Sequence, residues 1–130
     1  MPHEAREGGI IVEHEEPNLV KISFEPGASP GGRHALSVIR GIDARIPLDR
    51  PVLFLVDAPV REGFTLLARL EFIDWLRKKP RGCRLAVYNV PSTARSTAET
   101  LLVSFPVESR VFRDEASARA WLTSPPSGRA

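Results

Sequence analysis

Residues 51–64 read PVLFLVDAPVREGF, and the apolar run inside this stretch decides the fold. Residues 52–56 (VLFLV) carry an apolar side chain at every position. Because successive side chains of a strand point to opposite faces, such a strand must be buried on both sides. That environment is typical of the centre of a parallel sheet that helices cover on both faces. The sequence therefore predicts an α/β domain with Asp57 at the carboxyl end of a central strand.

A helix is predicted over residues 65–79, directly after this strand. Leucines and one isoleucine at helical spacing form its apolar stripe, namely Leu66, Leu67, Leu70, Ile73 and Leu76. We expect Arg69 to lie away from this stripe, on the surface. Phe72 and Trp75 flank the stripe, and we expect them to complete a wide core face. If Trp75 were exposed instead, the helix would offer a surface for a homodimer.

The remaining elements follow from alternation, turn residues and caps. Residues 9–13 and 19–25 are strand-like and are joined by a turn with Pro and Asn, which predicts an antiparallel hairpin. The other predicted elements are a helix from residue 33 that Gly41 ends or interrupts, strands over 84–90 and 109–112, a helix through Leu102 capped by Ser92 or Thr93, and a helix over 114–122 capped by Asp114. Strand-helix units after the hairpin predict a mixed sheet with parallel core strands covered by helices.

Length and composition favour one domain. The chain has 130 residues, enough for a single hydrophobic core. Residues 1–8 and 124–130 are polar and lack an apolar period, so we expect both to be disordered tails. The predicted domain spans residues 9–123.

Charge and cysteine content exclude several classes of function. Lys and Arg number 18 against 16 Asp and Glu, and the basic residues are dispersed, which argues against nucleic-acid binding. The single cysteine, Cys83, cannot form a disulfide within the chain, and no N-terminal segment resembles a signal peptide. The apolar runs are far shorter than the roughly 20 residues of a transmembrane helix. We therefore expect a soluble cytoplasmic protein.

Three segments together resemble a known family. They are residues 52–76 (VLFLVDAPVREGFTLLARLEFIDWL), 84–90 (RLAVYNV) and 111–122 (VFRDEASARAWL). Over about residues 9–123 the chain is similar to the SpoIIAA-like (STAS/SEC14-type) family of small bacterial proteins. The resemblance implies a fold like that of anti-sigma-factor antagonists and of lipid-carrying CRAL-TRIO domains, with a binding or regulatory role.

The resemblance also bears on phosphorylation. STAS domains that act as partner switches are phosphorylated on a Ser or Thr just after a central strand. Here Ala58 and Pro59 follow Asp57, and the hydroxyl group of this loop belongs to Thr65, several residues further on. The resemblance therefore implies a module from which the phosphoswitch serine is absent.

Polar side chains collect at the predicted carboxyl edge of the parallel strands. Helix N-termini at this edge would offer free N–H groups to a small anion. The candidate ligand-binding residues are Asp57, Arg61, Thr65, Asn89, Ser92, Thr93, Arg95 and Asp114. The alternative interpretation is that Ser92, Thr93 and Asp114 serve as helix caps and that Asp57 bonds the backbone of its own turn.

The sequence gives little support to a phosphoacceptor, a metal site or a catalytic nucleophile. A receiver-type phosphoacceptor at Asp57 would need an acidic pair followed by a helix after the first strand and a Lys after the last strand, and the sequence offers neither. The three histidines and Cys83 lack metal-ligand spacing, and no nucleotide-binding or nucleophile motif occurs. We expect no catalytic residue, metal or cofactor.

Three hypotheses about function follow. We favour a non-enzymatic module that binds a protein partner, a second copy of itself, or a small or lipidic ligand. The alternatives are an anion- or nucleotide-responsive regulatory module that uses the helix N-termini near Asp57, Ser92 and Asp114, and a small enzyme with Asp57 as acid or base. An apolar pocket behind the first helix would favour a lipidic ligand, whereas a phosphate at the Asp57 edge would favour the anion hypothesis.

Overall fold

The computed structural model describes residues 3–15, 17–27, 31–58 and 66–124. Within them, one sheet has the strand order β1-β2-β3-β4-β5-β6, with β1 to β3 antiparallel and β3 to β6 parallel. The strands are β1 (His3–Glu7), β2 (Ile10–Glu15), β3 (Leu19–Phe24), β4 (Leu53–Asp57), β5 (Arg84–Tyr88) and β6 (Glu108–Val111). The helices are α1 (Gly32–Arg45), α2 (Leu66–Arg77), the 3-10 turn η1 (Ser92–Ala94), α3 (Arg95–Leu102) and α4 (Glu115–Leu122). Across these residues no helix has both the length and the apolar character needed to cross a membrane.

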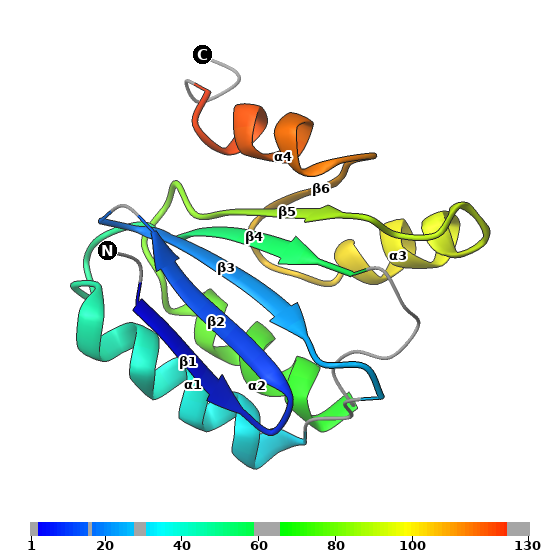
Figure 1. Cartoon of the computed structure of the whole chain (residues 1–130). Helices are drawn as coiled ribbons and strands as arrows, with labels where there is room; N and C mark the ends of the chain where they lie inside the picture. The colour runs from blue at the N-terminus through cyan, green and yellow to red at the C-terminus, as the bar shows by residue number, and fades with distance from the viewer. Residues whose placement is uncertain (1–2, 16, 28–30, 59–65, 125–130) are drawn as a thin grey trace.

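β4 lies inside the sheet and is covered on both faces, as its sequence predicts. Phe54 belongs to the larger hydrophobic core, to which α1 and α2 contribute. Leu55 points to the opposite face and packs with Ala118 and Leu122 of α4. Figure 1 shows α1 and α2 on one side of the sheet and α4 on the other. The predicted α/β class and the parallel core strands are confirmed.

The N-terminal segment differs from the prediction. Residues 1–8 were expected to be a disordered tail, but His3–Glu7 form β1 at the edge of the sheet. Gly8 and Gly9 have φ values of 60° and 88°, which suit a two-residue hairpin turn into β2. The prediction was wrong because backbone hydrogen bonds of an antiparallel ladder hold this edge strand. Such bonds do not require alternating apolar side chains, so the sequence pattern did not indicate the strand.

α1 continues through Gly41, where the sequence predicted an end or an interruption. It ends at Arg45. Ile42 and Ile46, on the core side, are 0% and 2% exposed. Their burial outweighs the roughly 1 kcal/mol that a glycine costs inside a helix. Pro47 then prevents the helix from continuing.

α3 lacks the predicted side-chain cap. Ser92 and Thr93 lie in η1, and the N-cap position of α3 is Ala94, which has no side-chain bond to offer. The tight turn arises because Pro91 accepts a hydrogen bond from the Ala94 N–H at 2.8 Å. The predicted cap of α4 is confirmed, since Asp114 Oδ1 accepts from the backbone N–H of Ser117 at 2.8 Å.

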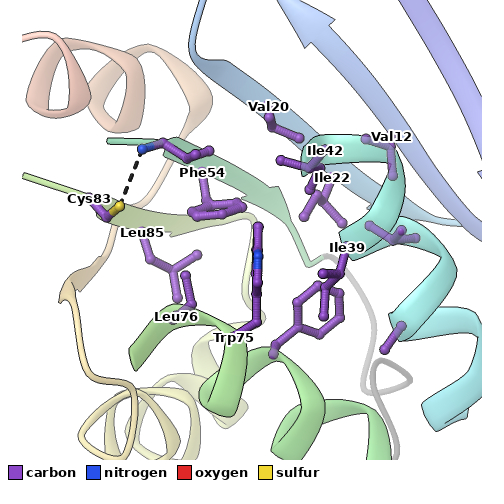
Figure 2. Close-up of a cluster of buried hydrophobic side chains, with 14 of the residues drawn as sticks. Val12, Val20, Ile22, Ile39, Ile42, Phe54, Trp75, Leu76, Cys83 and Leu85 are labelled. Carbon is purple, nitrogen blue, oxygen red and sulfur yellow. Dashed lines mark hydrogen bonds between the residues drawn. The ribbon is translucent and has the colours of Figure 1, made fainter. Parts of the chain in front are cut away.

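Trp75 is a core residue, as we expected, and it joins α2 to α1. Its ring makes edge-to-face contacts with Phe54 and Phe72, with centroids 5.7 and 6.3 Å apart. Its Nε1–H donates to both carboxylate oxygens of Asp43 on α1, each at 3.2 Å. Figure 2 shows Trp75 rising from α2 toward Phe54. Because Trp75 is buried, the condition under which we expected a homodimer through α2 is not met.

Cys83 is a buried structural residue, as predicted. Its Sγ accepts the backbone N–H of Val52 at 3.2 Å, the bond drawn as a dashed line in Figure 2. Burial raises the pKa of the thiol. A thiol held in its protonated form is a poor nucleophile, so Cys83 contributes packing rather than reactivity.

A network of charged side chains ties α4 to β2 and β3. The Arg119 guanidinium donates to both oxygens of Glu15 at 2.7 and 2.9 Å and, through Nε, to Glu115 at 2.7 Å. Lys21 lies 3.4 Å from the same Glu115 carboxylate. The hydrogen bonds from Arg119 hold the pKa values of Glu15 and Glu115 below their usual range. The stability that this network gives to the packing of α4 against the sheet should therefore depend on pH.

Replacing Arg119 with glutamine will lower the free energy of unfolding by about 1 kcal/mol near neutral pH, because the pairs are partly exposed. A carboxylate with a lowered pKa in the folded state stabilises above its unfolded pKa, and that contribution is lost as pH falls through the folded pKa. Urea denaturation should therefore show the difference between wild type and Arg119→Gln shrinking between about pH 6 and pH 3. Lys78→Gln, which removes an exposed pair with Asp74, is the control and should cost less than about 0.5 kcal/mol. A pH-independent Arg119 effect would contradict the assignment.

Candidate ligand-binding site

An apolar cavity of about 700 Å³ lies between the sheet, α2 and α3. Side chains of three parallel strands form its floor, namely Ile22, Phe24, Phe54, Val56, Leu85 and Val87. The cavity is partly open to solvent, and its volume falls within the roughly 300–1,000 Å³ of small-molecule sites. Its location follows from the alternation of the strands, because these residues share one face of the sheet.

α2 supplies one wall of the cavity. Phe72, Trp75 and Leu76 line it, and Arg69 lies on the same helix face one turn earlier. The sequence placed Arg69 on the surface, away from the apolar stripe, and this is wrong. It placed Leu70 in the apolar stripe, but Leu70 is 51% exposed. The error arose because apolar residues surround most of α2, so the pattern did not determine the rotation of the helix.

α3 supplies the opposite wall. Ala98, Leu101 and Leu102 of α3 line the cavity, together with Ala94 at the end of η1. Yet no residue of α3 is buried, and Leu101 is 42% exposed. An amphipathic helix normally buries its apolar face within its own protein. Here that face borders the cavity instead.

Arg69 is the charged side chain among the described residues that line the cavity. The residue is partly exposed, but its Nε is buried and has no hydrogen-bond partner within the part of the chain that the structure describes. Thr93 and Thr97 are the other polar lining residues there. The walls thus combine a large hydrocarbon surface with one cation.

Asp57 and Asn89 lie together at the carboxyl ends of β4 and β5, as the sequence predicted. Asn89 Nδ2 donates to Asp57 Oδ1 at 3.1 Å. Because Val56 faces the cavity, alternation turns Asp57 to the α4 side of the sheet. There the Tyr88 hydroxyl donates to Glu115 at 3.3 Å, and burial, followed by the charge of Asp57, raises the pKa of Tyr88. The sheet separates this acidic cluster from the cavity.

Arg95 and Asp114 each have partners of their own. Arg95 donates through Nε to Glu99 at 3.4 Å and through Nη2 to the Val111 carbonyl at 3.3 Å. Asp114 caps α4, and its bonds with Ser117 lower the pKa of its carboxyl group. These contacts engage two of the candidate ligand-binding residues with partners inside the protein.

The remaining candidates are dispersed. Ser92 is exposed in η1, whereas Thr93 lines the apolar cavity. Arg61 and Thr65 lie outside the described residues. No cluster of three or more metal-binding side chains occurs in the described ranges. An anion site at the Asp57 edge stays a prediction.

Comparison with known proteins establishes the fold. No protein-family model and no curated protein matches the sequence. A solved structure does, that of an uncharacterised DUF3478-family protein with a SpoIIAA-like fold from Shewanella loihica PV-4. The two chains are 16% identical, and the match covers 94% of this chain and 95% of the other with a TM-score of 0.61. This protein has a SpoIIAA-like fold.

The SpoIIAA-like fold confirms the resemblance predicted from the sequence, and at this identity the likeness establishes the fold alone. Sequence reasoning considered an apolar pocket behind the first helix, whereas the cavity lies between the sheet, α2 and α3, and the contribution of Arg69 to it was missed. One signal was present, because Arg69 precedes Phe72 and Leu76 at helical spacing and so shares a face with two apolar residues. A long charged residue on such a face is normally interpreted as covering the core with its stem.

Proposed function

We propose that this protein is a non-enzymatic binding module that holds a small apolar or lipidic ligand in the cavity between β3–β5, α2 and α3. The observation that carries the proposal is the apolar face of α3, which borders this cavity and has no buried residue. A ligand that filled the cavity would remove this face from water. Each Å² of apolar surface that such a ligand removed from water would favour binding by roughly 25 cal/mol.

The chemistry of the walls supports binding rather than catalysis. The polar side chains among the described lining residues are those of Arg69, Thr93 and Thr97. Carboxylate, imidazole and thiol groups, the usual acids, bases and nucleophiles of enzymes, do not occur among these described lining side chains. The SpoIIAA-like fold, which suggests a STAS-type regulatory or binding module, is consistent with this proposal.

Titration with the neutral apolar dye N-phenyl-1-naphthylamine tests the proposal. We expect saturable binding with a rise in dye fluorescence. Ala98→Phe places a ring in the cavity and should weaken binding by about tenfold or more, which corresponds to about 1.4 kcal/mol. Ser96→Phe adds the same ring to an exposed position of α3 and should leave the affinity unchanged.

Two results would contradict the proposal: no saturable binding by the wild-type protein, or equal affinities for Ala98→Phe and Ser96→Phe. Circular dichroism of both variants would show whether each keeps the fold. Native mass spectrometry of protein purified from its source cells would supply independent support through a retained small molecule.

A further inference from the structure

We propose that the ligand of this cavity is a single-chain amphiphile with a carboxylate head group, and that Arg69 binds the carboxylate while the apolar walls hold the chain. The inference rests on the proposed function, because it names the class of ligand that the cavity accepts. It begins from one observation: a guanidinium nitrogen is buried beside an apolar cavity without an acceptor in the described part of the chain.

A buried guanidinium N–H is costly to leave without an acceptor. The arginine side chain carries five N–H donors and no acceptor, so only an oxygen or a similar group brought close to it can satisfy Nε. A buried donor without a partner destabilises the folded state, and a charged donor does so more strongly. Arg69 lines the cavity and its Nε is buried without a partner in the described part of the chain, so the group that the cavity can supply to it is an acceptor carried by a ligand.

Other arginines of the chain show which acceptor suits this position. Arg84, Arg95 and Arg119 each direct Nε to a glutamate carboxylate, at 3.2, 3.4 and 2.7 Å. Arginine and carboxylate match in geometry as well as in charge, because two parallel N–H groups meet two oxygens. A ligand carboxylate would give Arg69 the same kind of partner.

The charge of the cavity favours a head group with one negative charge. Among its described lining residues, Arg69 is the cation, and no acidic side chain contributes. A single guanidinium balances a carboxylate, whereas a phosphate monoester carries up to two negative charges and would keep an unbalanced charge beside hydrocarbon. The carboxylate is therefore the better match.

Burial places the head group near the opening and the chain inside. Arg69 is partly exposed, whereas Phe54, Leu76 and Leu85 on the walls are 3%, 4% and 7% exposed. A side chain of this kind presents its charged end toward water and its stem along apolar surface. A ligand bound to Arg69 would thus extend its chain toward the interior, against Trp75 and Phe54.

Calorimetric titration with dodecanoate and dodecanol tests the inference, because the two probes share a chain length and differ in charge. The wild-type protein should bind dodecanoate at least about tenfold more tightly than dodecanol. Arg69→Met should weaken dodecanoate binding by at least about tenfold and leave dodecanol unaffected, which removes the preference. Arg69→Lys should keep part of it, since an ammonium group supplies charge without the planar fork. Arg77→Met removes an exposed positive charge from the same helix and should change neither affinity.

The outcomes separate the two proposals. If neither probe binds the wild-type protein, the proposed function fails and the inference fails with it. Equal wild-type affinities for the two probes, or a preference that survives in Arg69→Met, would overturn the role of Arg69 and leave binding in the cavity standing. Urea denaturation without ligand gives a second readout: Arg69→Met should unfold at the same or a higher urea concentration than wild type, because it removes a buried donor. A clear loss of stability would assign Arg69 to the fold and overturn the inference.

Discussion

Replacing Trp75 with alanine will lower the free energy of unfolding by about 3–5 kcal/mol. Trp75 is 8% exposed and connects α2 to the sheet through Phe54 and to α1 through Asp43. The substitution removes a large apolar surface and two aromatic contacts, each worth about 0.5–1.5 kcal/mol beyond its area. The space it leaves joins the neighbouring cavity, so the surrounding side chains have little means of filling it. Urea denaturation followed by far-ultraviolet circular dichroism measures the loss.

Two further variants divide this effect into its parts. Trp75→Phe keeps an aromatic ring and loses the N–H group that Asp43 accepts, so it should cost about 1–2 kcal/mol. Leu70→Ala changes the same helix at a position that is 51% exposed and should cost less than about 1 kcal/mol. A loss below about 1 kcal/mol for Trp75→Ala would show that α2 does not depend on this residue for its docking.

Replacing Arg84 with methionine will destabilise the protein by about 3 kcal/mol. Arg84 is 5% exposed, and its Nη1 donates to the Trp121 carbonyl at 2.6 Å and to the carbonyl and hydroxyl oxygens of Ser124 at 3.2 and 3.0 Å. Its Nε donates to Glu108 of β6 at 3.2 Å. The guanidinium thus satisfies carbonyl groups at the C-terminal end of α4, where the helix dipole favours a positive charge.

The methionine side chain preserves the stem of Arg84 but leaves these carbonyls and Glu108 without their donor. Arg110→Met is a matched control, because Arg110 lies over the same Trp121 ring at 5.5 Å from an exposed position on β6. It should cost less than about 1 kcal/mol. Equal losses for the two variants would mean that the hydrogen bonds of Arg84 add nothing to its contact with the Trp121 ring, which is 5.0 Å from the guanidinium.

Trp75 and Arg84 hold helices on opposite faces of the sheet, and the sequence did not indicate which partners either residue would have. Trp75 was expected in the core because apolar residues surround most of α2, and the structure adds its bond to Asp43, 32 positions earlier in the chain. Arg84 begins a strand that is buried at every position, so its charge had no evident partner. Its partners come from β6 and the end of α4, and only the folded chain brings them to it.

The polar edge was predicted in part. Asp57 and Asn89 follow neighbouring parallel strands, so strand order alone was enough to bring them together. The direction in which Asp57 points depends on which face of β4 the helices α2 and α4 cover. A run that is apolar at every position carries no information about that choice, because either orientation buries the same number of side chains.

Apart from β1, the order of strands and helices and the central position of β4 were determined by the sequence by itself, because they arise from local periods and turns. The SpoIIAA-like fold was predicted from the resemblance of three segments to a known family. The tertiary structure decided the rest. The rotation of α2, which turns Arg69 toward the cavity and Leu70 outward, depends on packing against α1 and the sheet. The cavity lies between α2 and α3, and the placing of two helices relative to each other is a property of the folded chain that no local pattern of residues encodes.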